Sequence, residues 1–227
     1  EAEGFQRDFF EKSLQHGAGA FFDGISFHYY PINPVDFPTL GHKVNEVREI
    51  MTRNGVYDKL MWVTETSMWV NELGYEWLDG SVERQRNFIV RELTRGFAAG
   101  VENMFWFDPL EYNVPEGFAE RWMIDENYQP VNGYSTFVTY AEKIDGMHCL
   151  GSYTESLPTN IEAYKFIGHG RLLYILWSTT GATTVEMPAV NPATLTDRDG
   201  ETSVQLSPAD GRISFEVGPV PVFLVFP

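Results

Sequence analysis

Up to about residue 145, hydrophobic positions along the chain repeat with two different periods. Stretches in which apolar residues recur every third or fourth position alternate with short apolar runs that end near Gly, Pro or an acidic residue. This alternation predicts strand–helix units around a parallel sheet. The predicted helices span residues 5–17, 41–55, 81–100 and 131–144, and the predicted strands span residues 20–31, 59–66 and 101–109.

The helical period disappears after residue 145. The rest of the chain contains short strands separated by turns rich in Gly, Pro, Asn and Asp. Strand spacings of about ten residues are typical of an antiparallel sandwich. We therefore predict an α/β domain over residues 1–144, followed by an all-β, antiparallel β-sandwich over residues 145–227.

Each predicted strand of the first part has two faces, because successive side chains point to opposite sides. By this count Glu65 shares a face with Met61 and Val63, and Trp106 shares a face with Met104. If helices cover one side of a sheet of three strands, the count leaves Met61, Val63 and Met104 on the uncovered side. We therefore expect that side to need further cover.

Four functional side chains fall at corresponding ends of the three predicted strands. They are His28 and Tyr30 on the first, Glu65 on the second and Trp106 on the third. Taken singly, they are more simply a structural histidine, a loop glutamate or a core tryptophan. Their shared position favours a functional site, because the carboxyl ends of parallel strands carry the chemistry in barrels.

Composition argues against several kinds of partner. The 227 residues are 43% hydrophobic, which is enough for a substantial core, and they carry a formal net charge of −16. That charge argues against nucleic acid, since binding a phosphate backbone requires clustered Lys and Arg. No apolar run approaches the roughly 20 residues that span a bilayer, so we expect no membrane partner.

Metal and cofactor sites are not indicated by the sequence. The five histidines show no ligand spacing, and no glycine-rich phosphate loop is present. We therefore expect no metal and no cofactor. The single cysteine, Cys149, excludes an intramolecular disulfide and is expected to be a small buried hydrophobic residue.

Three motifs resemble those of a known enzyme family. SFHYYP, WVTETSMW and MFWFDP, in this order with helices between them, resemble the sixth, seventh and eighth strands of a clan A glycoside hydrolase (β/α)8 barrel. The closest resemblance is to family 39, which contains β-xylosidase and α-L-iduronidase relatives. The segment after MIDENYQP resembles the β-sandwich that follows the barrel in such enzymes. The resemblance implies that residues 1–144 form a partial barrel.

The resemblance also implies roles for individual residues. Glu65 matches the nucleophile of a retaining glycosidase, and Tyr30 matches the tyrosine that donates a hydrogen bond to it. His28 matches the histidine near the same site, and Trp106 resembles the platform under the sugar ring. Trp69, in the loop after Glu65, is a further candidate for contact with substrate. Carbohydrate is therefore the expected partner.

A retaining glycosidase also needs an acid/base carboxyl group about 5–5.5 Å from the nucleophile. In this clan it follows an asparagine at the end of the fourth strand, and no Asn-Glu pair of the chain fits that position. Glu72, Glu76, Glu111 and Glu116 lie in loops at the correct end, but each is more simply a solvated charge. We therefore expect the acid/base to be missing from this chain.

Strands six to eight alone cannot close a barrel, and their outer edges would leave backbone groups unpaired. We expect a homo-oligomer, a complementary barrel-forming chain or segment, or loops that cover the open side. The predicted function is that of a retaining β-glycosidase acting on xylosides, glucosides or related plant polysaccharide fragments. The alternative is a catalytically inactive, truncated homologue that binds carbohydrate or serves as an interaction module.

Overall fold

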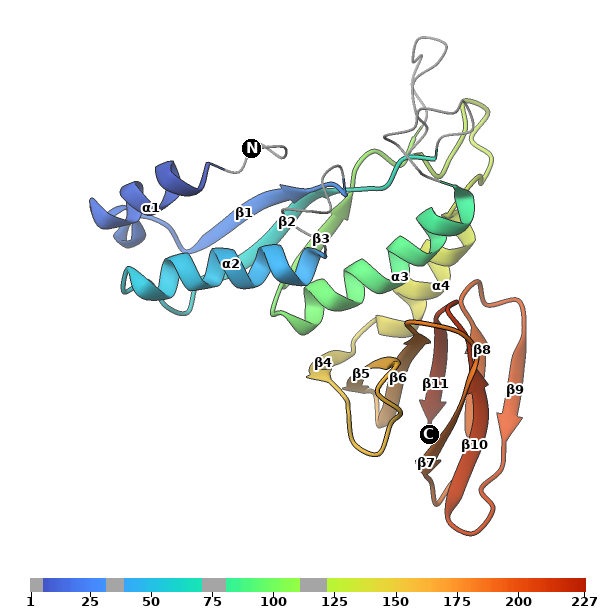
Figure 1. Ribbon diagram of the computed structural model, residues 1–227. Helices are drawn as coiled ribbons and strands as arrows, with labels where there is room; N and C mark the ends of the chain where they lie inside the picture. The colour runs from blue at the N-terminus through green and yellow to red at the C-terminus, as the bar shows by residue number, and fades with distance from the viewer. Residues whose placement is uncertain (1–5, 32–38, 71–80, 111–121) are drawn as a thin grey trace. The chain divides into compact units, whose positions relative to one another are not determined.

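The computed structural model describes residues 6–31, 39–70, 81–110 and 122–227 (Figure 1). The chain divides into two compact units. The first contains Glu1–Gln85 and Arg95–Val131, and the second contains Arg86–Thr94 and Asn132–Pro227. Each unit has its own sheet structure and its own buried residues.

A parallel sheet lies at the centre of the first unit. Its described strands are β1 (Gly24–Tyr29), β2 (Leu60–Thr66) and β3 (Asn103–Trp106), in that order, and both pairings are parallel. Along the chain they alternate with the helices α1 (Arg7–Gln15), α2 (Leu40–Arg53) and α3 (Val82–Ala98), and a short 3-10 helix, η1 (Ala18–Ala20), precedes β1. This arrangement confirms the predicted strand–helix alternation around a parallel sheet.

The helices α2 and α3 begin where the sequence provides a capping side chain. Thr39 Oγ1 accepts a 3.3 Å hydrogen bond from the backbone N–H of His42, and Ser81 Oγ accepts one of 3.2 Å from that of Arg84. Such caps satisfy backbone N–H groups that the first helical turn leaves without a partner. The start of the predicted helix 81–100 is therefore explained by Ser81.

One face of this sheet is covered by α2 and by the two ends of α3 (Figure 1). Met61 and Val63 of β2 point toward the helices and are completely buried. Their neighbours Leu60 and Trp62 point to the opposite side and are 47% and 40% exposed. We call the side of the sheet that carries Leu60 and Trp62 the open face.

The predicted assignment of the two faces is wrong. The sequence count placed Met61, Val63 and Met104 on the uncovered side, whereas all three lie toward the helices. Met104 packs so closely against α3 that a Cβ added to Gly96 would meet its sulfur at 2.7 Å. Both faces of β2 are apolar, so alternation separates the faces without indicating which one meets the helices.

Antiparallel strands form the second unit. The larger sheet of described strands has the order β4, β5, β6, β11, β8 and β9, and β7 pairs with β10 in a smaller sheet. Their bounds are β4 (His148–Ser152), β5 (Ile161–Gly168), β6 (Arg171–Ser178), β7 (Thr183–Pro188), β8 (Ala193–Asp197), β9 (Ser203–Leu206), β10 (Arg212–Val217) and β11 (Val222–Phe226).

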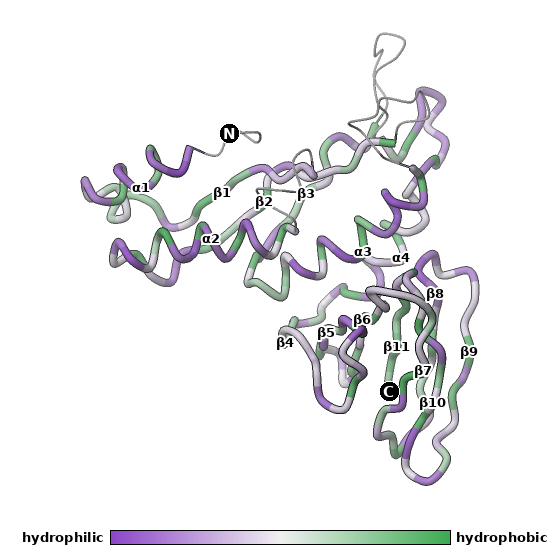
Figure 2. Tube along the Cα trace, viewed as in Figure 1, coloured by the Kyte–Doolittle hydropathy of each residue, from purple (hydrophilic) through white to green (hydrophobic). Residues whose placement is uncertain are grey.

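Buried residues of both sheets form one hydrophobic cluster. Val185 and Phe215 of the smaller sheet belong to it, as do Leu176 and Leu224 of the larger sheet. Figure 2 shows the hydrophobic character of β11, which lies inside the larger sheet. Since side chains of both sheets meet in one core, the sheets pack face to face. The predicted fold class, α/β followed by antiparallel β structure, is confirmed at this level, and the partial barrel remains a prediction.

The helix α4 (Tyr134–Ile144) belongs to the second unit. Its Tyr140 ring lies 6.5 Å from the ring of Phe223 in β11. Thr136 of the same helix donates a hydrogen bond to the Asp199 carboxylate, which also accepts one of 2.6 Å from Arg198. The division into domains 1–144 and 145–227 remains a prediction.

Three sequence expectations concern single features of the described residues. None of the described helices is long and apolar enough to cross a membrane. Within the described segments, no group of three or more His, Cys, Asp or Glu side chains could hold a metal ion. Cys149 is a free thiol whose pKa is raised by burial. A raised pKa is typical of a structural cysteine rather than a nucleophile.

Candidate functional site

An irregularity in the register of β2 determines which way Glu65 points. Phe27 of β1 pairs with Val63, yet the next residue, His28, pairs with Glu65. The strand β2 therefore contains one extra residue, Thr64, in the manner of a β-bulge. A one-residue offset moves the following side chains to the other face. Glu65 accordingly lies with His28 on the open face, and not on the helix-covered face where the sequence count placed it.

Two side chains of the β1 end contact the same oxygen of Glu65. The hydroxyl of Tyr30 donates a 2.6 Å hydrogen bond to Oε2, and Nδ1 of His28 lies 3.2 Å from that oxygen. The Glu65 side chain is 27% exposed. Among the described residues, no polar group contacts Oε1. The carboxylate is therefore held through one oxygen, and the other is available to a ligand.

An aromatic pair stands beside this carboxylate. The rings of Tyr30 and Trp69 have centroids 5.1 Å apart, with their planes inclined at 38°. Trp69 follows β2 in the chain, so the end of one strand and the loop after its neighbour contribute to one surface. The structure thus brings together His28, Tyr30, Glu65 and Trp69 from the set predicted by sequence.

Trp106 lies on the other side of the sheet. It pairs in register with Thr66, and alternation along β3 places it with Met104 toward the helices. Its exposed fraction is 9%. The next residue, Phe107, is 38% exposed and points by the same alternation to the open face. Sequence reasoning missed Phe107, because a run of three aromatic residues gives no signal for which ring faces Glu65.

A buried lysine fixes the end of β1 from the helix side. Lys43 of α2 is 1% exposed, and its ammonium donates a 2.8 Å hydrogen bond to the backbone carbonyl of His28. The same ammonium lies 5.8 Å from the centre of the Phe27 ring. A buried charge is costly unless it has such partners. Lys43 therefore holds the backbone from which His28 projects.

The chain just beyond Glu65 is also enclosed. Thr66 and Ser67 are completely buried, and their hydroxyls have no hydrogen-bond partner among the described residues. Gln85 of α3 donates a 2.9 Å hydrogen bond to the backbone carbonyl of Met68. The burial of Thr66 and Ser67, together with the hydrogen bond from Gln85, fixes the backbone that follows Glu65.

The arrangement suits a carboxylate that acts on a ligand at the open face. Tyr30 and His28 occupy Oε2, so the lone pairs of Oε1 remain for a substrate atom. The aromatic pair offers a surface for the apolar side of a sugar ring. The four glutamates suggested as substitutes for a missing acid/base, Glu72, Glu76, Glu111 and Glu116, lie outside the described residues.

Comparison with solved structures finds glycoside hydrolases that share the fold of this chain. No protein-family model and no curated protein matches the chain. Among solved structures, a family 39 glycoside hydrolase from the gut symbiont Bacteroides cellulosilyticus WH2 matches with a TM-score of 0.70 and 19% identity, over 96% of this chain and 47% of that one. A GH30 endoxylanase from Clostridium papyrosolvens C71 matches with a TM-score of 0.54 and 10% identity, over 97% and 60% of the two chains. A glucosidase from Croceicoccus marinus matches with a TM-score of 0.59 and 13% identity, over 98% and 57%.

These similarities concern the fold. At such low identity they show only that the chain shares its fold with parts of the GH39 and GH30 structures. The chain spans between 47% and 60% of the length of these three structures.

Proposed function

We propose that the chain carries the nucleophile of a retaining β-glycosidase, Glu65, and that its substrates are xylosides, glucosides or related plant polysaccharide fragments. The proposal proceeds from the fold shared with glycoside hydrolases, among them an endoxylanase and a glucosidase. The observation that supports it most is the pair of contacts from Tyr30 and His28 to Oε2 of Glu65.

The proposed reaction begins with attack by Oε1 of Glu65 on the anomeric carbon of the sugar. A bond forms between these two atoms, while the bond to the leaving oxygen breaks and that oxygen takes a proton from an acid. Water then attacks the same carbon, gives a proton to the conjugate base of that acid and releases the Glu65 carboxylate. Tyr30 and His28 orient the carboxylate in both steps through Oε2.

The acid/base belongs, in this proposal, to a segment or a partner chain outside the described residues. The same segment or chain would supply further parallel strands and complete a barrel with β1, β2 and β3. The exposed apolar side chains of the open face, among them Leu60, Trp62 and Phe105, support this part of the proposal. Apolar residues on a sheet face are normally covered in parallel sheets.

A second candidate function is carbohydrate binding without hydrolysis. The Tyr30–Trp69 pair supports it, because an aromatic surface binds a sugar ring whether or not an acid/base is present. The exposed ring of Phe107 adds to the aromatic character of the open face. Both functions use the same surface, and covalent chemistry at Glu65 separates them.

The test uses a substrate whose leaving group needs no acid. A β-xyloside or β-glucoside with fluorine beside the anomeric carbon and dinitrophenolate as leaving group fits this need, because dinitrophenolate departs without a proton. We expect intact-mass spectrometry to show one covalent glycosyl adduct on the chain. Peptide mapping should locate that adduct at Glu65.

The Glu65→Gln variant is the matched control, since it keeps the shape of the side chain and removes its charge. We expect it to give no adduct. An adduct at another residue, or none on a chain that still binds xylo-oligosaccharide, would contradict the nucleophile assignment. Binding that is lost in Trp69→Ala would then support the second function.

A further inference from the structure

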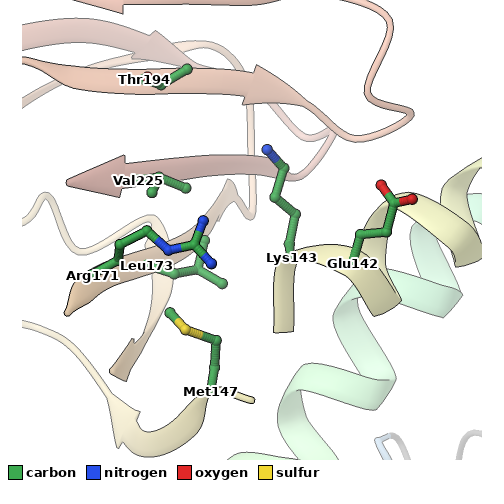
Figure 3. A pocket seen from close by; sticks show the side chains of 7 residues that line it. All are labelled: Glu142, Lys143, Met147, Arg171, Leu173, Thr194 and Val225. Carbon is green, nitrogen blue, oxygen red and sulfur yellow. The ribbon is translucent and has the colours of Figure 1, made fainter. Parts of the chain in front are cut away.

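A pocket in the second unit is lined by two positively charged side chains. It has a volume of about 350 Å³ and lies between the end of α4 and the strands β6, β8 and β11 (Figure 3). Its lining residues are Glu142, Lys143, Met147, Arg171, Leu173, Thr194 and Val225. A pocket of this size is large enough for a small organic ligand.

Lys143 and Arg171 enter this pocket from different elements. Figure 3 shows the Lys143 ammonium and the Arg171 guanidinium reaching into the same space, while the Glu142 carboxylate lies beyond Lys143. Lys143 donates a 3.2 Å hydrogen bond to Thr196 Oγ1. In the described part of the chain, neither cation forms an ion pair. Burial, together with the positive charge of Arg171, lowers the pKa of Lys143, and the negative charge of Glu142 opposes this shift.

The two arginines of another pocket differ, because both have partners. The pocket along α2 is lined by Arg48 and Arg53. Arg53 pairs with Glu11 at 2.6 Å, and Arg48 donates a 3.1 Å hydrogen bond to the carbonyl of Ala99. One carboxylate, Glu142, lines the same cavity as these two cations, and neither cation forms an ion pair with it. In a chain with 32 acidic and 16 basic residues, this local excess of positive charge indicates a place for an external anion.

We propose that this pocket binds a small ligand carrying an oxyanion, either a carboxylate or a phosphate, between Lys143 and Arg171. The guanidinium of Arg171 presents a planar fork of N–H donors that matches two oxygens of such a group. Lys143 adds a compact positive charge, and an anion between the two side chains removes their mutual repulsion. Leu173, Val225 and Met147 offer apolar surface to the remainder of the ligand.

The proposal is independent of Glu65, because all lining residues of the pocket belong to the second unit. Two sources of the oxyanion are distinguishable by titration. Calorimetry on the full chain at low ionic strength compares inorganic phosphate, glucuronate and glucose. Glucuronate and glucose differ in a carboxylate, so binding of glucuronate alone identifies an acidic sugar. Tighter binding of phosphate than of glucuronate identifies a phosphate group.

Arg171→Gln is the decisive variant. The Arg171 side chain is exposed and forms no hydrogen bond with the described residues, so we expect the variant to remain folded. We expect it to weaken binding of the preferred anion at least about tenfold. Arg212→Gln is the matched control, because Arg212 lies outside the pocket, is partly exposed and pairs with Glu186. It removes the same charge and should leave the affinity unchanged.

Lys143→Gln provides a second variant, and thermal unfolding of each protein confirms that it is folded. We expect Lys143→Gln to weaken anion binding as Arg171→Gln does. If the wild-type chain binds neither phosphate nor glucuronate in a saturable way, the proposal is wrong. It is also wrong if Arg171→Gln and Arg212→Gln bind the anion equally well.

Discussion

His28 and Glu65 are register partners on neighbouring parallel strands, and Nδ1 of His28 lies 3.2 Å from Oε2 of Glu65. If the residues after the Phe27–Val63 pair also paired one to one, His28 would lie opposite Thr64. The extra residue in β2 brings the carboxylate beside the imidazole. The candidate site therefore depends on the backbone of β2 as much as on the identity of its side chains.

Removing the Tyr30 hydroxyl tests the support of Glu65. Tyr30→Phe keeps the ring against Trp69 and deletes the donor of the 2.6 Å hydrogen bond. Because a hydrogen bond to a charged group contributes about 1.5–3 kcal/mol, we expect the rate of covalent trapping to fall by roughly tenfold or more. Mass spectrometry over time measures this rate. An unchanged rate would mean that His28 alone is sufficient to orient the carboxylate.

The open face should govern self-association. Trp62 and Phe105 are exposed there, with ring centroids 6.3 Å apart. We expect sedimentation to show a species larger than the 25.9 kDa monomer, and the double variant Trp62→Ser with Phe105→Ser to shift it toward the monomer. Val190→Ser removes an exposed apolar residue of the second unit and should have no effect. A clean wild-type monomer at micromolar concentration would show that the strand edges and the open face need no partner.

Asp199 should make stability depend on pH. Burial acts to raise the pKa of its carboxyl, but hydrogen bonds from Arg198 and Thr136 and the charges of Arg198 and Arg86 outweigh burial, so the pKa lies below that of an ordinary aspartate. The ionised group therefore stabilises the fold above the pKa of the unfolded chain, and this contribution is lost as the pH falls toward the folded-state value.

We expect Asp199→Asn to lower the free energy of unfolding near neutral pH by about 1–3 kcal/mol. At low pH the difference from the wild type should become smaller, because the wild-type carboxyl is then protonated as well. Urea unfolding at neutral and acidic pH measures both differences. Asp210→Asn, in an exposed turn, is the control and should leave stability nearly unchanged. A constant difference at all pH values would assign the loss to packing rather than charge.

Gly168 should not tolerate a side chain. An added Cβ would lie 2.4 Å from the carbonyl oxygen of Gly146 and 2.9 Å from Cα of Met147, and these backbone atoms cannot rotate away. We expect Gly168→Ala to destabilise the chain by about 1–3 kcal/mol. Gly181→Ala is the control, because no heavy atom lies within 4 Å of its added Cβ. Equal unfolding temperatures for the two variants would contradict this close approach.

The periods of the hydrophobic positions predicted the helices and strands of the first part well, because an element that buries one face repeats its apolar residues with the period of that element. The helix predicted at 81–100 is α3, with Ser81 at its cap and Gly100 at a positive φ of 90° beyond its end. In the antiparallel part, the apolar stretch 160–178 contains two strands, β5 and β6, because His169 and Gly170 turn the chain with φ values of 50° and 72°.

Counting positions along the strands could not predict which face of the sheet each site residue points to. The motifs located Glu65 at the end of a strand, but Thr64 gives no sequence signal for the extra residue that turns Glu65 to the open face. Trp106 and Phe107 are adjacent aromatic residues, and only the register of β3 against β2 shows which ring lies toward the helices. Single-residue shifts of this kind are set by the packing of neighbouring strands.

Lys43 links the core of the first unit to the candidate site. It lies among the buried residues of α2, and its ammonium holds the carbonyl of His28, the strand partner of Glu65. Methionine at this position would fill a similar volume but would leave that carbonyl without its donor. The stability of the core and the geometry of the site therefore depend on the same buried side chain.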